Sequence, residues 1–266
     1  MPDPLAGELR VERTGRVLTL TIDNQSARNA MSPMIYAAGG AAIRAATDDA
    51  TIGAIVIAGA GGTFSAGGNA NRLLAARKGP RDAPNASMRS LHEWVLAIRH
   101  SPKPVIAAVE GFAAGAGCSL ALNCDLIVAA TDAKFIMAYV KIGMTADGGA
   151  TAALMSLVPR QLASEMMFTG DAVGAERLHQ LGVVNRLTAK GAAIGEAMQW
   201  ATKIAAGPPQ AMKSIKRLLD AAIRNSLGEQ LDLERGVMLD AYYLPESGEG
   251  ISAFLEKRPA DFQRSE

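Results

Sequence analysis

Two short apolar segments, each ending in a glycine-rich loop, constrain the fold of this chain more than any other feature. Residues 54–58 are apolar, rich in β-branched side chains, and lead into the glycine-rich stretch 59–68; residues 104–109 lead in the same way into 111–117. Runs of this length and composition predict strands buried on both faces, which is typical of a parallel sheet. Small residues at the end of a strand let backbone N–H groups turn toward a ligand, so two such loops can face one oxygen atom.

The rest of the chain alternates between strand and helix patterns. We expect a hairpin over residues 9–23, a helix from Ser32-Pro33 to about residue 46, and helices over 91–98 and 118–123. Further strands are predicted at 125–129 and 135–137, and a helix from residue 150 with a break at Pro159. Residues 72–90 lack periodicity and are expected to be mobile. The alternation predicts an α/β fold.

From residue 192 onward the pattern is almost purely helical, interrupted by Gly207-Pro208-Pro209. We therefore expect a core over residues 1–191 and a helical C-terminal region over 192–266. That region is expected to dock on the core or to reach a neighbouring subunit.

Charge and cysteine content exclude several classes of protein. The 266 residues carry a net charge of +1, which gives no electrostatic footprint for nucleic acid or an anionic membrane. The two cysteines, Cys118 and Cys124, have no metal-ligand spacing, so we expect buried free thiols and no metal site. Residues 1–16 lack the hydrophobic run of a secretory signal, and the longest uncharged run, 14 residues, is too short to span a bilayer. A cytoplasmic protein without membrane contact is the expectation.

The second loop runs into a predicted helix N-terminus, where unpaired N–H groups favour a negative charge, although glycines in either loop also simply make turns. Neither loop matches a nucleotide-binding motif.

The sequence Gly117-Cys-Ser-Leu-Ala121 imitates a nucleophile elbow, and Ser119, an aspartate and His179 follow the order of a hydrolase triad. The missing final glycine and the exposed helix pattern around His179 argue against that interpretation. His92 and His100 are expected to be surface or helix-packing residues.

Asp147 lies in Gly143-Met-Thr-Ala-Asp-Gly-Gly149, just before an apolar helix. Spacing alone favours a helix-capping aspartate over one that performs chemistry.

Considered together, several motifs resemble the enoyl-CoA hydratase/isomerase, or crotonase, superfamily. They are Arg28-Asn-Ala-Met31, Phe64-Ser-Ala-Gly-Gly-Asn69, residues 103–117, Asn123-Cys-Asp125 and Gly182-Val-Val-Asn185. The resemblance implies a spiral of ββα units, a helical C-terminal region, homotrimers or homohexamers, and coenzyme A thioester substrates. Finer similarity is to a group labelled alternative-type oxepin-CoA hydrolase or enoyl-CoA hydratase.

The resemblance also implies site residues. The backbone N–H groups of Gly68 and Ala116 would form an oxyanion hole for the thioester oxygen, where each donor contributes roughly 2.7–4 kcal/mol of transition-state stabilisation. Phe254 and Lys257 resemble the family's C-terminal contacts to the nucleotide, made either within the subunit or across a subunit boundary. The further expected binding residues are Ala27, Arg28, Asn29, Ala66, Gly67, Asn69, Trp94, Phe112, Gly115, Ser119 and Tyr139.

The chain departs from the hydratase pattern at both catalytic glutamates, which are replaced by Ser119 and Tyr139. Neither is a competent base near neutral pH without strong activation. Asp147 falls where isomerases of the superfamily carry their acidic residue, and where a related dehalogenase carries its nucleophile. We therefore expect isomerisation of an unsaturated or cyclic acyl-CoA by one carboxylate, with no metal or redox cofactor. Hydration or ring-opening hydrolysis, and a catalytically silent acyl-CoA binding protein, remain as alternatives.

Overall fold

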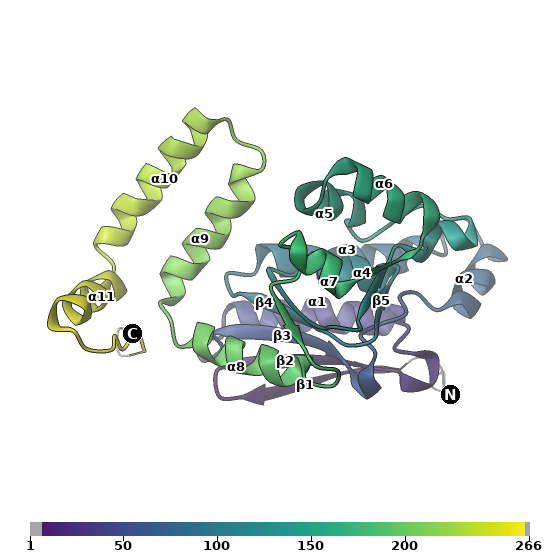
Figure 1. Ribbon diagram of the computed structural model, residues 1–266, viewed down its shortest axis with the longest axis horizontal. Coiled ribbons are helices and arrows are strands. Elements are labelled where there is room, and N and C mark those ends of the chain that lie inside the picture. Colours follow the sequence, from purple (N-terminus) through teal and green to yellow (C-terminus); the bar gives the residue numbers. More distant parts are fainter. Residues whose placement is uncertain (1–6, 264–266) are drawn as a thin grey trace.

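The computed structural model describes residues 7–263 and contains a six-stranded sheet with the order β1-β2-β3-β4-β6-β9 (Figure 1). β1 and β2 form the predicted antiparallel hairpin, and the remaining neighbours pair in parallel. The strands are β1 (Glu8–Thr14), β2 (Val17–Asp23), β3 (Ala54–Gly59), β4 (Val105–Val109), β6 (Leu126–Ala130) and β9 (Arg186–Thr188). The two apolar segments that end in glycine loops are thus adjacent parallel strands, β3 and β4.

A second sheet of three strands has the order β5-β7-β8. Its strands are β5 (Phe112–Ala114), β7 (Lys134–Ile136) and β8 (Ala172–Gly174). Between β4 and β5 the chain turns at Gly111, whose φ of +56° suits glycine. The second glycine loop therefore leaves the large sheet and continues into the small one.

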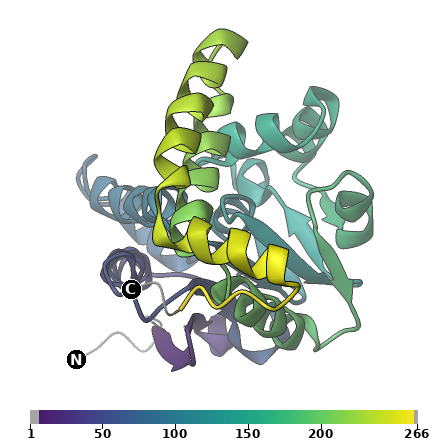
Figure 2. The ribbon, with the colours of Figure 1, turned by 90° about the vertical axis from the view of Figure 1, so that its left-hand side faces the viewer.

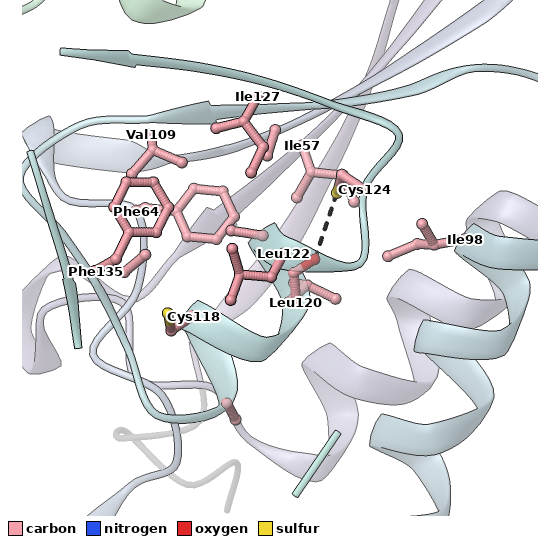
Figure 3. Close-up of a cluster of buried hydrophobic side chains, with 14 of the residues drawn as sticks. Ile57, Phe64, Ile98, Val109, Cys118, Leu120, Leu122, Cys124, Ile127 and Phe135 are labelled. Atoms are coloured by element: carbon pink, nitrogen blue, oxygen red, sulfur yellow. Dashed lines mark hydrogen bonds between the residues drawn. The ribbon is translucent and has the colours of Figure 1, made fainter. Parts of the chain in front are cut away.

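The main core lies on one face of the large sheet, against α1 (Pro33–Thr47), α3 (Asn85–His100) and α4 (Ala116–Leu122). Alternate residues of β2 and β3 face this core, as the two-residue period of a strand requires. Figure 3 shows part of it around α4, including both cysteines, which are buried free thiols as predicted. Ser32 caps α1 by accepting a hydrogen bond from the Ile35 N–H.

The opposite face of the sheet is covered by α8 (Ala193–Ala205), whose four buried alanines let the helix approach closely. Glu110, at the end of β4, accepts hydrogen bonds from the backbone N–H groups of Gly191 and Ala193 and so holds the start of this helix. The start of the C-terminal region thus docks on the core, which is one of the two arrangements expected for it.

Three helices beyond Gly207-Pro208-Pro209 form a C-terminal arm that extends away from the sheets (Figures 1 and 2). They are α9 (Pro209–Ala222), α10 (Leu227–Tyr242) and α11 (Pro245–Glu256). Lys216 anchors α9 to the core, since its Nζ lies 2.6 Å from Asp125 Oδ2 and donates to the Ile98 carbonyl. Large apolar side chains on the arm are exposed, among them Tyr243 and Phe254.

The mobile segment predicted over residues 72–90 is wrong. It contains most of α2 (Ala70–Arg77) and the first turns of α3. Asn69 initiates α2, because its side chain accepts hydrogen bonds from the Asn71 and Arg72 N–H groups. Periodicity was invisible here because the two short helical stretches bury little apolar surface before Leu91.

The remaining helices are α5 (Ala150–Leu157), α6 (Arg160–Thr169) and α7 (Ala175–Gln180), and the predicted break at Pro159 is confirmed. Short 3-10 helices span η1 (Gln25–Ala27), η2 (Ala60–Gly62) and η3 (Ala138–Ile142). Within residues 7–263, none of the helices is long and apolar enough to cross a membrane. The expectation that residues 1–16 carry no secretory signal falls partly on residues 1–6, which lie outside the described residues.

Candidate active site

The two glycine-rich loops are in direct contact. Ser65 pairs with β5 in both directions, donating its N–H to the Phe112 carbonyl and accepting from the Ala114 N–H. A Cβ placed on Gly67 would lie 2.5 Å from the Ala114 oxygen and 3.1 Å from the Ala116 nitrogen. The backbone at Gly67 therefore packs against the start of α4 at a distance that only glycine permits, and its φ of +87° also requires glycine.

Hydrogen bonds from buried side chains hold the two loops in this contact. The Ser65 Oγ donates to the Asn29 carbonyl at 2.7 Å and accepts from the Gly67 N–H at 3.0 Å. The Asn29 amide donates to the Ala60 and Thr63 carbonyls, and its oxygen accepts from the Asn24 N–H. Both donors of that amide are thus used within the protein. The Asn29 side chain therefore shapes the loop, and the residue is 1% exposed; its role in binding substrate stays a prediction.

Gly68 and Ala116, whose backbone N–H groups are the expected oxyanion-hole donors, are both residues of this contact region. Ala116 is the first residue of α4, so its N–H has no partner inside the helix. Gly68 follows Gly67, whose carbonyl accepts from the Met31 N–H in an isolated parallel bridge. This bridge, together with a hydrogen bond from the Ala66 N–H to the Arg28 carbonyl, brings residues 27–29 and 66–69 together, and their role in binding substrate stays a prediction.

Asp147 does not cap a helix, contrary to the expectation from spacing alone. The N-cap of α5 is Gly149, with a φ of +74°, and no side chain completes it. The Asp147 carboxylate is about a quarter exposed. Its segment is held by Asn123, whose amide donates to the carbonyls of Ser119 and Gly148. The carboxylate is therefore free of a capping role.

Ser119 and Tyr139, which replace the two glutamates, lie against the Asp147 segment. The Tyr139 hydroxyl donates to the Asp147 carbonyl at 3.1 Å and lies 2.9 Å from the Ser119 Oγ. Burial is the main cause that raises the pKa of Tyr139 to about 12. Tyr139 thus stays protonated near neutral pH and acts as a neutral hydrogen-bonding group. Because Ser119 is one turn along α4 from Ala116, these contacts join the backbone of Asp147 to the second loop.

Tyr36 on α1 completes this cluster and was not identified from the sequence. Burial raises the pKa of its hydroxyl well above the usual value, with smaller contributions from Tyr139 and Asp147. The hydroxyl lies 4.0 Å from the position of a Cβ on Gly68. The Tyr36 hydroxyl therefore lies beside the Gly68 loop. The only sequence signal was an aromatic residue on the buried face of a helix.

His92 is the second residue that sequence reasoning missed. Its Nε2 lies 2.5 Å from Asp147 Oδ1, although 55 residues separate the two in the chain. The sequence analysis placed His92 on the surface, and its side chain is indeed 51% exposed, but it is also paired with the candidate catalytic carboxylate.

The other predicted binding residues have different surroundings, and their roles in binding stay predictions. Trp94 is fully buried against Gly39 at the contact of α1 with α3, so it is a core residue and not a pocket wall. The Asn69 side-chain oxygen caps α2. Phe112 lies on β5 with 46% exposure, and Gly115 is the N-cap of α4. Phe254 and Lys257 lie at the end of α11 on the arm, so contact with substrate through another subunit stays a prediction.

The hydrolase triad is not assembled. The Ser119 Oγ donates to the Gly115 carbonyl, whereas the His179 Nδ1 on α7 lies 2.7 Å from the Val184 carbonyl oxygen. The serine is thus engaged by its own helix and Tyr139, without a histidine to activate it.

Comparisons with known proteins agree with this arrangement. The family described as enoyl-CoA hydratase/isomerase matches residues 12–265. The 2,3-dehydroadipyl-CoA hydratase of Escherichia coli K12 is 34% identical, covering 96% of this chain and 98% of that protein. The 1,2-epoxyphenylacetyl-CoA isomerase of the same strain is also 34% identical, covering 92% and 94%. A crystal structure of an enoyl-CoA hydratase from Polaromonas sp. JS666 superposes with a TM-score of 0.94 at 45% identity, covering 96% and 99%. The chain belongs to the enoyl-CoA hydratase/isomerase family and has the crotonase fold.

Proposed function

We propose that this acyl-CoA enzyme isomerises a double bond or a ring of an unsaturated acyl-CoA, with Asp147 as the single acid and base. The observation that carries the proposal is the composition of the cluster: one carboxylate, Asp147, accompanied by the hydroxyls of Ser119, Tyr139 and Tyr36. A hydratase of the two-glutamate type needs a second carboxylate to position water. Isomerisation needs one group that removes a proton and returns it at another carbon.

For a 3-enoyl thioester the first step breaks the C2–H bond. The proton passes to an oxygen of Asp147, and the electron pair moves through the thioester carbonyl to give a dienolate. The developing oxyanion would accept hydrogen bonds from the Gly68 and Ala116 N–H groups. Because these donors are fixed by the contact between the two loops, they need no reorganisation as charge develops.

In the second step the dienolate collapses, the carbonyl re-forms, and C4 takes a proton from the Asp147 carboxyl group. The double bond now lies between C2 and C3, in conjugation with the thioester. The Tyr139 hydroxyl donates a hydrogen bond to the backbone carbonyl of Asp147 and so positions that residue. Because the pKa of Tyr139 is raised to about 12, the hydroxyl remains a donor in both steps. The scheme uses protons and the substrate alone, so it requires no metal or redox cofactor.

The test is the ultraviolet absorbance of the conjugated enoyl thioester when purified protein receives an unconjugated 3-enoyl-CoA. We expect the absorbance to rise, and Asp147→Asn to lower the rate by about 10²–10⁴-fold, the usual contribution of a positioned acid or base. Asp132→Asn is the matched control, since that exposed carboxylate pairs with Lys190 in a different region. Coenzyme A affinity, measured by calorimetry, should change little in either variant.

Full activity in Asp147→Asn would refute the assignment. Without an absorbance rise, the same protein is given a 2-enoyl-CoA in ¹⁸O-labelled water. Incorporation of the label would establish hydration, the reaction named for the dehydroadipyl-CoA relative. Binding with neither reaction would indicate a silent acyl-CoA binding protein.

A further inference from the structure

The pairing of His92 with Asp147 has no part in the two-step scheme above, yet the structure builds it from several contacts. Leu91, the residue before His92, packs on Gly148, where a Cβ would lie 3.1 Å from the leucine Cδ2. One turn later Val95 contacts Gly149 at 3.6 Å by the same measure. The turn of α3 that carries His92 is therefore seated along residues 147–149, and the histidine meets Asp147 Oδ1 at 2.5 Å.

The exposure of the pair differs from that of the surrounding hydroxyls. The His92 side chain is 51% exposed and that of Asp147 27%, whereas Tyr36 and Ser119 are buried. One face of the imidazole thus contacts water while Nε2 contacts the carboxylate. Imidazole can accept a proton at one nitrogen and release one from the other, and no other side chain does this as readily near neutral pH.

This geometry bears on the fate of the proton between the two steps. After abstraction Asp147 is a carboxylic acid, and the proton can return to the substrate or exchange with solvent. A carboxyl group enclosed by buried hydroxyls would favour internal return. A carboxyl group joined to an exposed imidazole has a route to water.

We propose that His92 is a positioning residue that also connects Asp147 to solvent, so that protons taken from the substrate exchange with water before they are returned. The inference rests on the proposed function. The carboxylic acid transfers its proton to Nε2, giving carboxylate and imidazolium. When the exposed ring turns away from Asp147, the imidazolium gives its Nε2 proton to water and takes another proton from water at the same nitrogen. When the ring returns, Nε2 transfers this solvent proton to Asp147, so that charge and protons balance.

The experiment follows solvent deuterium in two substrates. A 3-enoyl-CoA is isomerised in D₂O and the product is analysed for deuterium at C4. A saturated thioester, butyryl-CoA, is incubated in the same solvent and the loss of its C2 protons is followed. The saturated compound cannot isomerise, so exchange at C2 reports the connection with solvent directly.

The informative variant is His92→Gln, because the glutamine amide can still donate to Asp147 but cannot relay a proton. We expect C2 exchange and the deuterium content at C4 to fall by about tenfold or more, and by a clearly larger factor than kcat for isomerisation. His100→Gln, at the exposed end of the same helix, is the matched control and should behave as the unsubstituted protein.

Equal deuterium incorporation by His92→Gln and the unsubstituted enzyme would overturn the connection with solvent and leave isomerisation by Asp147 standing. Loss of isomerisation in His92→Gln in parallel with exchange would also overturn it, since the histidine would then be needed for the chemical step itself. Absence of both isomerisation and exchange in the unsubstituted protein would overturn the proposed function together with this inference.

Discussion

The two sides of the candidate site are built in opposite ways. The glycine loops are held by buried hydrogen bonds at Ser65 and Asn29, both almost fully enclosed. The Asp147 segment lies partly exposed and is held by side chains from other elements, Asn123, Tyr139 and His92.

The difference in burial between the glycine loops and the Asp147 segment agrees with the function proposed for each. Backbone donors stabilise an oxyanion best when they are fixed before charge develops, which favours a rigid, buried frame. A group that exchanges protons needs contact with titratable partners or water, which favours partial exposure. We therefore expect substitutions on the loop side to affect stability and catalysis together, and substitutions on the Asp147 side to affect mainly catalysis.

The largest effect is expected for Gly67→Ala. The new Cβ would meet the Ala114 oxygen at 2.5 Å, and the φ of +87° is strained for alanine. We expect a loss of about 1–3 kcal/mol in the free energy of unfolding, measured by urea titration. Displacing a donor should also lower kcat by about 10²-fold or more.

Gly68→Ala is the matched control for that substitution. A Cβ at Gly68 has no contact closer than 3.8 Å, and its φ is not in the left-handed region. We expect its free energy of unfolding to change by less than about 0.5 kcal/mol. Equal destabilisation of the two variants would contradict the tight loop contact.

A loss of stability of similar size, with a smaller loss of activity, is expected for Ser65→Ala, which removes one buried hydroxyl. The Asn29 carbonyl and the Gly67 N–H would lose their partner, at a cost of about 1–3 kcal/mol. The activity should fall with it, because the same hydroxyl positions the loop. Ser156→Ala removes an exposed hydroxyl that bonds to its own helix, and should cost less than about 0.5 kcal/mol. Similar unfolding curves for the two variants would argue against a rigid loop frame.

The smallest effect on stability near neutral pH is expected for Tyr139→Phe, which acts on the Asp147 side. Loss of the hydrogen bond to the Asp147 carbonyl should lower kcat by about tenfold, with KM nearly unchanged. If Tyr139→Phe lowered the free energy of unfolding as much as Ser65→Ala and left kcat unchanged, the expectation that the Asp147 side mainly affects catalysis would be wrong.

The pH dependence of stability provides a second measurement on this variant. Burial raises the pKa of Tyr139 from 10.0 to about 12, so the folded protein holds this proton more tightly than the unfolded chain. The resulting stabilisation is fully present below pH 10 and is lost as the pH rises toward 12. The stability difference between the unsubstituted protein and Tyr139→Phe should therefore shrink over that range. A constant difference would show that burial does not perturb this hydroxyl.

The predictions from sequence succeeded where the signal was local. The apolar runs of β3 and β4, the Ser32 cap and the break at Pro159 depend on near neighbours in the chain, and each lies where expected. The prediction failed over residues 72–90, where short exposed helical stretches leave no apolar stripe.

The sequence by itself determined the alternation of strands and helices and the family. It also determined that Ser119 and Tyr139 replace the two glutamates of hydratases, while Asp147 supplies a carboxylate at another position. Only the tertiary structure decided which groups surround that carboxylate. His92 and Tyr36 come from helices 55 and 111 residues before Asp147, and Asn29 is engaged by carbonyls more than 30 residues away. The physical reason is that hydrogen bonds and burial depend on distance in space. A local sequence pattern does not indicate which backbone groups from distant parts of the chain will lie nearby and need a hydrogen-bond partner.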